Sequence, residues 1–201
     1  MGRLILVRHG QTDMNKEHKY YGRLDVPVNE IGKEQAKKAC NNLEAFNIDY
    51  DKIYSSNLKR AYETAEIINY KKYDICIDER LQEMDFGIFE GLSYEEIMDR
   101  YPNEMEKLKN DWRTYSYVTG ENPYEMQERA IDFLNSILNS IDKTKNILVA
   151  THWGIICSLL SHLFSNKLES YWKFDVKNGG IIVIEFTEDN FPILSYFNIG
   201  G

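Results

Sequence analysis

An arginine, a histidine and a glycine follow one another at Arg8, His9 and Gly10, directly after the aliphatic run 4–7. The run predicts a short buried strand, and the carboxyl end of such a strand is where open α/β sheets bind ligands. A guanidinium and an imidazole at this edge could hold a small anion and react with it. The alternative is that both side chains only form the polar cap of the first strand, so the interpretation depends on partners elsewhere in the chain.

A second histidine repeats this pattern near the end of the chain. Residues 147–150 are again aliphatic, and His152 and Gly154 follow them, ahead of an apolar stretch at 155–164 that predicts a helix. Strand and helix patterns alternate between the two histidines, which is typical of a parallel sheet. Because parallel strands end at the same edge, we expect both imidazoles to meet there.

The rest of the pattern supplies the elements that must position these side chains. Residues 10–28 have no period, and we interpret them as a long active-site loop. Helices are expected at 29–46, 58–69, 94–101 and 123–141, and further strands at 51–56, 75–77, 181–186 and 193–198. The expected helix caps are Asn57, Ser93 and Asn122. The apolar face of the first helix is predicted from Ile31, Ala36, Ala39, Leu43 and Phe46.

Composition restricts the class of protein. The chain has 201 residues, of which 43% are hydrophobic, and this is enough for one core in one domain with an insertion. A net charge of -8 disfavours nucleic acid and anionic membranes as partners, but it allows a small anion held by a few cations. No apolar run reaches the ~18–20 residues that span a bilayer, and no signal peptide precedes the first strand. We therefore expect a cytoplasmic enzyme or binding protein.

The three cysteines, Cys40, Cys76 and Cys157, are far apart and have no metal-ligand spacing. We expect neither a disulfide nor a zinc site, and interpret them as small buried apolar residues. No Walker loop, GxGxxG motif or metal triad occurs, so we expect no cofactor and no metal.

Four motifs resemble those of the histidine phosphatase superfamily, whose members are also called phosphoglycerate-mutase-like. They are Arg8-His9-Gly10-Gln11-Thr12 with Asn15, Ser55-Ser56 with Arg60 and Glu63-Thr64-Ala65, Leu81-x-Glu83 with Gly87 and Glu90-Gly91, and Thr151-His152-x-Gly154. The resemblance implies an α/β fold, a three-layer αβα sandwich with a mostly parallel central sheet. It also implies a helical lid insertion at about 84–122 within a single domain that covers 1–201.

The resemblance implies a phosphatase that works through a phosphohistidine. His9 would be the nucleophile, with its other ring nitrogen tied to a backbone carbonyl. Arg8 and Arg60 would hold the phosphate oxygens. His152 would be a protonated donor opposite, and the helix start at Gly154 would add its backbone dipole.

Two further assignments are less direct. Asn15 would donate a hydrogen bond to the phosphate, and the alternative is an asparagine that caps a loop. Glu83 would be the general acid and then the base. By residue type alone Asp85, Glu90 and Glu63 compete for this role; the family pattern favours Glu83, and we interpret Glu90 as structural. Outside the site, His162 is expected to be a partly buried helix residue and His18 a surface residue.

The substrate is expected to be a small-molecule phosphomonoester, and a homodimer is allowed. A mutase is disfavoured because residues 94–119 carry only the scattered cations Arg100, Lys107, Lys109 and Arg113. The stretches 84–91, 110–112, 120–121 and 171–179 resemble the α-ribazole phosphatases of cobalamin assembly, which implies α-ribazole 5′-phosphate as substrate. Rings of the predicted lid could stack on its heterocycle or could be ordinary packing; these are Phe86, Trp112, Tyr115 and Tyr117. A broad-specificity phosphomonoesterase, a mutase and a non-catalytic phospho-ligand binder remain as alternatives.

Overall fold

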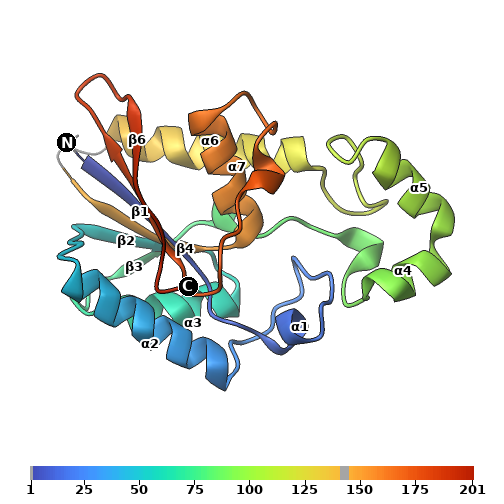
Figure 1. Ribbon diagram of the computed structural model, residues 1–201, viewed down its shortest axis with the longest axis horizontal. Helices are drawn as coiled ribbons and strands as arrows, with labels where there is room; N and C mark the ends of the chain where they lie inside the picture. Colours follow the sequence, from blue (N-terminus) through green and yellow to red (C-terminus); the bar gives the residue numbers. More distant parts are fainter. Residues whose placement is uncertain (1, 141–144) are drawn as a thin grey trace.

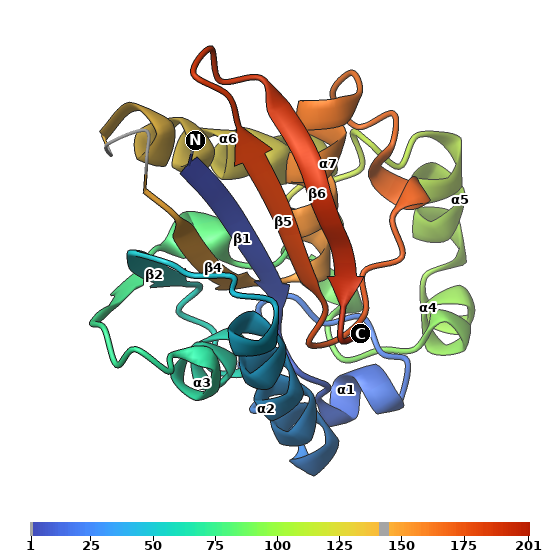
Figure 2. The ribbon, with the colours of Figure 1, turned by 60° about the vertical axis from the view of Figure 1, so that its left-hand side comes forward.

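A six-stranded sheet forms the centre of the protein, which a computed structural model describes for residues 2–140 and 145–201. The strand order is β3-β2-β4-β1-β5-β6 (Figure 2). The strands are β1 (Gly2–Arg8), β2 (Lys52–Ser55), β3 (Ile75–Ile77), β4 (Ile147–Thr151), β5 (Ile181–Phe186) and β6 (Pro192–Ile199). The strands β1 to β4 are parallel to one another, whereas β5 runs antiparallel to both β1 and β6. The predicted mostly parallel sheet is thus confirmed, with an antiparallel pair at one side.

Helices cover both faces of this sheet (Figure 1). On one face lie α2 (Glu30–Ala45) and α3 (Lys59–Ile68), and on the other α6 (Pro123–Ser140) and α7 (Trp153–Phe164). Strand β1 contributes to both cores, because Leu4 and Leu6 pack with α6 and α7 whereas Ile5 and Val7 pack with α2 and α3. Burial on both faces explains an unbroken aliphatic run. The predicted three-layer αβα sandwich is confirmed.

Helix α2 buries a narrower face than the sequence predicts. Its buried residues are Gly32, Ala36, Ala39 and Leu43, spaced so that small side chains face the sheet. Ile31 is 54% exposed and Phe46 is 49% exposed, so both were wrongly assigned to the core. Ile31 precedes Gly32 and therefore points about 100° away from the buried face. Phe46 lies beyond the last helical residue, where its ring meets Tyr196.

One of the three predicted helix caps is wrong. Leu58, not Asn57, precedes α3, and the Oδ1 atom of Asn57 instead accepts a hydrogen bond from Gln82. The first helical N–H of α3 donates to Asp25 at 2.7 Å, so a distant loop caps this helix. Asn122 does cap α6, because its Oδ1 atom accepts from the N–H groups of residues 124 and 125.

The other capping assignment is confirmed as a capping box at Ser93, which opens α4 (Tyr94–Arg100). Helix α5 (Pro102–Asn110) follows directly, and both helices stand apart from the sheet, beyond the carboxyl end of β1 (Figure 1). The end of the predicted helix at Ile141 lies outside the described residues. Short 3-10 turns occur at Glu79–Leu81, Gly87–Phe89 and Tyr171–Lys173, which are labelled η1, η2 and η3.

The loop 10–28 contains one short helix that the sequence does not reveal, α1 (Asp13–Lys16). A single turn is too short to show a 3.6-residue period. The loop is joined to the 84–122 segment by paired backbone hydrogen bonds, from Tyr20 N–H to Leu92 O at 2.8 Å and from Gly91 N–H to Tyr20 O at 2.7 Å. Segments far apart in the sequence therefore form one wall near the end of β1.

In the described part of the chain, none of the helices combines the length and the apolar character needed to cross a membrane. Cys40, Cys76 and Cys157 are free thiols, as expected. Only Cys157 is fully buried, because Cys40 and Cys76 are half-buried, so the expected burial holds for one of the three.

Candidate active site

The two histidines meet at the carboxyl ends of neighbouring strands. Strands β1 and β4 pair in parallel with Arg8 opposite Thr151, so the next residue of each chain segment is a histidine. The ring centroids of His9 and His152 lie 5.2 Å apart, and their side chains are 3% and 0% exposed. The predicted convergence of the imidazoles is confirmed.

The ring of His9 is held in one tautomer by its own neighbour. Its Nδ1–H donates to the carbonyl of Gly10 at 2.7 Å, so the lone pair of Nε2 remains available. Burial lowers the pKa of His9 well below its ordinary value, and the charges of Arg60 and Arg8 lower it further. The imidazole is therefore neutral, which is the nucleophilic form. The expected tie to a backbone carbonyl is confirmed.

Gly10 must be a glycine because of the close approach of another backbone. A Cβ atom at Gly10 would lie 2.2 Å from the carbonyl oxygen of Gly32 in α2. The N–H of Gly10 also donates to Thr64 Oγ1 at 3.1 Å, which ties the end of β1 to α3. These contacts fix the backbone that carries His9.

Arg60 is a fully buried cation whose position depends on the loop 10–28. Its Nη1 and Nη2 atoms donate to the carbonyls of Leu24 and Gly22 at 2.9 and 2.7 Å. Its guanidinium carbon lies 4.6 Å from the ring centroid of Tyr21, a cation–π contact. Burial lowers the pKa of Arg60, although a guanidinium stays charged at neutral pH. Its Nε–H has no hydrogen-bond partner among the described residues.

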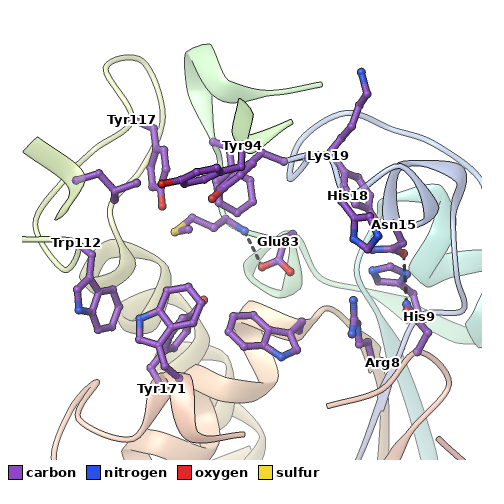
Figure 3. A pocket seen from close by; sticks show the side chains of 18 of the residues that line it. Arg8, His9, Asn15, His18, Lys19, Glu83, Tyr94, Trp112, Tyr117 and Tyr171 are labelled. Carbon is purple, nitrogen blue, oxygen red and sulfur yellow. Dashed lines mark hydrogen bonds between the residues drawn. The ribbon is translucent and has the colours of Figure 1, made fainter. Parts of the chain in front are cut away.

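Arg8 lies beside His9 in the same pocket (Figure 3). Its Nη1 atom donates to Val176 O at 2.6 Å, and its buried Nε–H has no partner in the described chain. Burial lowers the pKa of Arg8 as well. Two buried guanidinium groups thus line the pocket next to His9, each with donor capacity that an anion could use.

His152 differs from the expectation in its protonation. Burial lowers its pKa well below the ordinary value, and the charge of Arg60 is the next largest cause. Neither ring nitrogen has a hydrogen-bond partner among the residues that the structure describes. The imidazole is therefore neutral in the protein by itself, and only a nearby negative charge would favour the protonated form.

Glu83 lies between the two sides of the pocket in Figure 3 and is 8% exposed. Its Oε1 atom accepts from Met84 N–H at 2.9 Å and its Oε2 atom from Gly154 N–H at 3.1 Å. The N–H of Gly154 at the helix start thus binds this carboxylate, and the expected contribution of the helix dipole stays a prediction. A Cβ atom at Gly154 would lie 2.2 Å from Glu83 Oε1, so a larger residue there would displace this carboxyl group.

The competing carboxylates hold loops and do not line the pocket. Glu63 accepts from Val28 N–H at 3.0 Å and Asp85 from Gly87 N–H at 2.8 Å. Glu90 accepts from four backbone N–H groups, those of Gly22, Arg23, Leu24 and Phe86. The structural interpretation of Glu90 is confirmed.

Asn15 lines the pocket and also caps α1. Its Oδ1 atom accepts from Thr12 N–H at 3.1 Å, so the alternative of a loop-capping asparagine applies to its oxygen. Asn178, which the sequence did not single out, donates to the carbonyl of His9 at 3.0 Å and lines the same pocket. A lone asparagine ahead of a glycine pair gives no motif that could have revealed it.

The two other histidines are both exposed. His18 is a surface residue as expected, but it also lines the pocket (Figure 3). His162 was expected to be partly buried, and this is wrong because it lies on the outer side of α7, between the buried Ser161 and the half-buried Leu163.

Aromatic rings form the side of the cavity that lies across from Arg8 and His9 (Figure 3). The cavity has a volume of about 740 Å³. We call the following four residues the aromatic wall: Trp112, Trp153, Tyr171 and Trp172. They include all three tryptophans of the chain. Their ring centroids lie 5.0–5.5 Å from one another where they touch.

Three of the four aromatic residues predicted for the lid line the cavity, namely Phe86, Trp112 and Tyr117. Tyr115 instead stacks on Phe89 and donates its hydroxyl to Glu104 at 2.9 Å. Of the four basic residues between 94 and 119, only Lys109 lines the cavity. No cluster of three or more histidine, cysteine or acidic side chains suited to a metal ion was found in the described ranges.

A buried nucleophilic imidazole between two guanidinium groups, with a carboxyl group opposite, defines a phosphoric monoester hydrolase. The sequence model of the histidine phosphatase superfamily, branch 1, matches residues 4–199. The chain belongs to this family.

Relatives and solved structures agree with this assignment. The chain is 31% identical to phosphoserine phosphatase 1 of Hydrogenobacter thermophilus, over 96% of this chain and 91% of that protein. It is 29% identical to the adenosylcobalamin/alpha-ribazole phosphatase of Escherichia coli, over 88% of this chain and 86% of that protein. The crystal structure of the alpha-ribazole phosphatase from Shigella flexneri superposes with a TM-score of 0.91 at 28% identity, and covers 99% and 97% of the two chains.

Proposed function

We propose that this phosphatase transfers the phosphoryl group of a phosphomonoester to His9 and then to water. The observation that carries the proposal is the tautomer of His9. Its Nδ1–H is engaged with Gly10 O, so a neutral Nε2 lone pair is available beside Arg8 and Arg60. Phosphoryl transfer needs such an in-line nucleophile and cations on the equatorial oxygens.

In the first step the Nε2 atom of His9 forms a bond to phosphorus while the ester P–O bond breaks. Arg8 and Arg60 bind the non-bridging oxygens, and Asn15 donates a further hydrogen bond. Glu83 transfers its proton to the departing oxygen, which leaves as an alcohol. The phosphate dianion offsets the cations that lower the pKa of His152, so His152 takes up a proton and donates to the developing charge.

In the second step water attacks the phosphorus of the phosphohistidine. Glu83, now a carboxylate, accepts the proton of that water, and the P–N bond breaks to release phosphate. The same carboxyl group is thus acid and then base, which returns the site to its starting state. The cavity position of Glu83 supports this role, and its two backbone hydrogen bonds orient the carboxyl group there.

The substrate that we propose is α-ribazole 5′-phosphate, with residues 84–122 as the lid of a single domain. The aromatic wall lies across the cavity from His9 and offers ring faces to a planar heterocyclic leaving group. A cavity of about 740 Å³ is larger than a small alkyl phosphate needs. The relatives with α-ribazole in their names support the same substrate.

A broad-specificity phosphatase of small phosphomonoesters is the second candidate, supported by the relative named as a phosphoserine phosphatase. Its specific structural support is that two lysines, Lys19 and Lys109, line the cavity and could bind a carboxylate. A mutase would need a stronger grip on a second phosphate than these separated side chains provide.

Two experiments test the proposal. Rapid quenching in base after mixing with substrate should trap an acid-labile phosphate on His9; its absence in an active preparation would refute the mechanism. A panel of α-ribazole 5′-phosphate, nucleoside monophosphates, phosphoserine and phosphoglycerates, compared by kcat/KM, should show the highest value for α-ribazole 5′-phosphate. A flat profile would favour the second candidate.

A further inference from the structure

Arg129 in α6 contacts the backbone of Glu83, and all three nitrogens of its guanidinium group donate hydrogen bonds within the protein. Its Nη1 atom donates to the carbonyls of Arg80 and Gln82 at 2.8 and 2.6 Å, and its Nη2 atom to the carbonyl of Glu83 at 3.1 Å. Its Nε–H donates to Glu121 Oε2 at 3.0 Å, and Nη2 also contacts Glu121 Oε1. Three carbonyl groups of the short segment 80–83 are therefore held by one side chain.

The carboxylate of Glu121, which pairs with Arg129, also connects the two ends of the 84–122 segment. Glu121 lies at the end of the segment, and its Oε1 atom accepts from Asp85 N–H, at the start, at 3.1 Å. Glu121 also lies 3.7 Å from a guanidinium nitrogen of Arg23 in the loop 10–28. The side chains of Arg129 and Glu121 are only 17% and 15% exposed, so this pair is shielded from solvent far better than a surface ion pair.

We propose that Arg129, oriented by Glu121, is a positioning residue for Glu83: it fixes the backbone at residues 80–83 so that the carboxyl group reaches the leaving oxygen. This inference rests on the proposed function, in which Glu83 protonates that oxygen. Arg129 itself touches neither His9 nor the cavity, because it is not among the residues that line it. Its hydrogen bond to the carbonyl of Glu83 carries its effect on that residue through the backbone, while its charge also lowers the pKa of His152.

Substrates with different leaving groups can distinguish whether Arg129 positions Glu83 or only stabilises the fold. An alkyl phosphate expels a strongly basic alkoxide and needs a well-placed acid, whereas p-nitrophenolate leaves readily without a proton. A misplacement of about 1 Å costs roughly 10²-fold in rate where geometry matters. Loss of Arg129 should thus be felt with alkyl substrates and hardly at all with p-nitrophenyl phosphate.

The experiment measures kcat/KM for sn-glycerol 3-phosphate and for p-nitrophenyl phosphate, because this ratio reports the transfer to His9. The variants are Arg129→Gln, Arg129→Lys and Glu121→Gln, with Glu83→Gln as the reference for loss of the acid. The matched control is Arg80→Gln, since Arg80 also ties its neighbourhood to α6 through Asp78 and Asp132 without holding the carbonyl of Glu83. Thermal unfolding of every variant accompanies the kinetics.

We expect Arg129→Gln to lower kcat/KM about 100-fold with glycerol phosphate and less than about 3-fold with p-nitrophenyl phosphate. Arg129→Lys should recover part of the alkyl activity, because the ammonium can reach some of the same carbonyls. Glu121→Gln should also lower kcat/KM more for glycerol phosphate than for p-nitrophenyl phosphate, but by a smaller factor. This variant provides the test if Arg129→Gln does not fold. Arg80→Gln should leave the ratio of the two substrates unchanged.

An equal loss with both substrates in the Arg129 and Glu121 variants, while Glu83→Gln is selective, would overturn the inference and leave the proposed function intact. If Glu83→Gln itself lowers both activities equally, the role of Glu83 fails, and this inference fails with it. Trapping phosphate on His9 in each variant distinguishes the second case from loss of the nucleophile.

Discussion

The two sides of the cavity are built in different ways. Near His9 three buried polar groups are fixed by the backbone: His9 by Gly10 O, Arg60 by two carbonyls of the loop 10–28, Glu83 by two N–H groups. The aromatic wall is fixed by ring contacts, and Trp172 is 63% exposed. Directional hydrogen bonds hold a geometry more narrowly than ring packing does. We therefore expect the first side to determine the reaction and the second to determine which leaving groups fit.

The largest effect should come from His9→Ala, which tests whether the first side acts on every substrate alike. Loss of a nucleophile removes the covalent path, so kcat should fall by about 10⁴-fold or more. The factor should be the same for α-ribazole 5′-phosphate, glycerol phosphate and p-nitrophenyl phosphate. Steady-state kinetics on the three compounds measures it, and a variant that keeps substantial activity on any one of them would contradict the assigned role.

Gly154→Ala should be next in size, because the added methyl group presses on Glu83 far more than on the Tyr171 hydroxyl of the aromatic wall, which would lie 3.0 Å away. The added methyl group would lie 2.2 Å from Glu83 Oε1, so the carboxyl group must move. We expect roughly a 10²-fold loss of kcat/KM with alkyl phosphates. Ser158→Ala in the same helix is the control, because that buried hydroxyl has no hydrogen-bond partner in the described chain. Unchanged alkyl activity in Gly154→Ala would contradict the importance of this contact.

Trp112→Ala should sharpen the comparison by changing one substrate only. Stacking on a base is worth about 1–3 kcal/mol, so KM for α-ribazole 5′-phosphate should rise roughly 10- to 100-fold. The KM for glycerol phosphate should stay within about 2-fold, since that substrate has no ring to stack. Phe191→Ala removes a 66% exposed ring outside the cavity and is the matched control. Equal changes for both substrates would show that the wall only supports the fold.

The smallest effect is the pH dependence of the free energy of unfolding, which we expect to come from the side of the cavity that carries the histidines. Burial lowers the pKa of His9 and of His152, whereas in the unfolded chain both titrate near 6.5. Below that pH the unfolded chain binds more protons, so the free energy of unfolding decreases as the pH falls. Each histidine contributes up to about 1.4 kcal/mol per pH unit.

Urea unfolding at pH 7.5 and pH 5.5 measures this loss. His152→Gln should reduce the pH dependence, whereas Trp112→Ala should keep it in full. A pH dependence that is the same in the wild type and in His152→Gln would show that other groups cause it.

The reactive side of the cavity could be predicted because short motifs at strand ends carry it. Arg8, His9 and His152 follow aliphatic runs, and the parallel pairing of β1 with β4 brings them together as the alternation of elements required. The motifs could not predict which hydrogen-bond partner each of these polar groups would have. The N–H of Gly154 binds Glu83, and no spacing indicates which acceptor a helix start will meet.

Trp112 was predicted as a lid ring, but its contact with the other rings of the aromatic wall and the role of Arg129 could not be predicted, for another reason. Trp112, Trp153 and the pair at 171–172 come from separate segments, and only the docking of η3 against α7 brings their rings together. Arg129 lies within an amphipathic helix, where a basic residue is expected on the face exposed to solvent. Long-range docking, which leaves no periodic trace in a sequence, placed these residues.

The carboxylate of Glu90 ties residues 84–91, which we call the root of the 84–122 segment, to the loop 10–28. Residues 92–119, which we call the tip, lie outside this tie. By accepting from the N–H groups of residues 22–24 and 86, Glu90 fixes the loop whose carbonyls hold Arg60, so the root belongs to the phosphate side. Residues 92–119 contribute Tyr94, Lys109, Trp112 and Tyr117 to the cavity without such a tie to Arg60. We therefore expect a chimera that carries the tip of another family member to shift its leaving-group preference toward that member, while Trp153, Tyr171 and Trp172 keep their contribution and the phosphate chemistry stays its own.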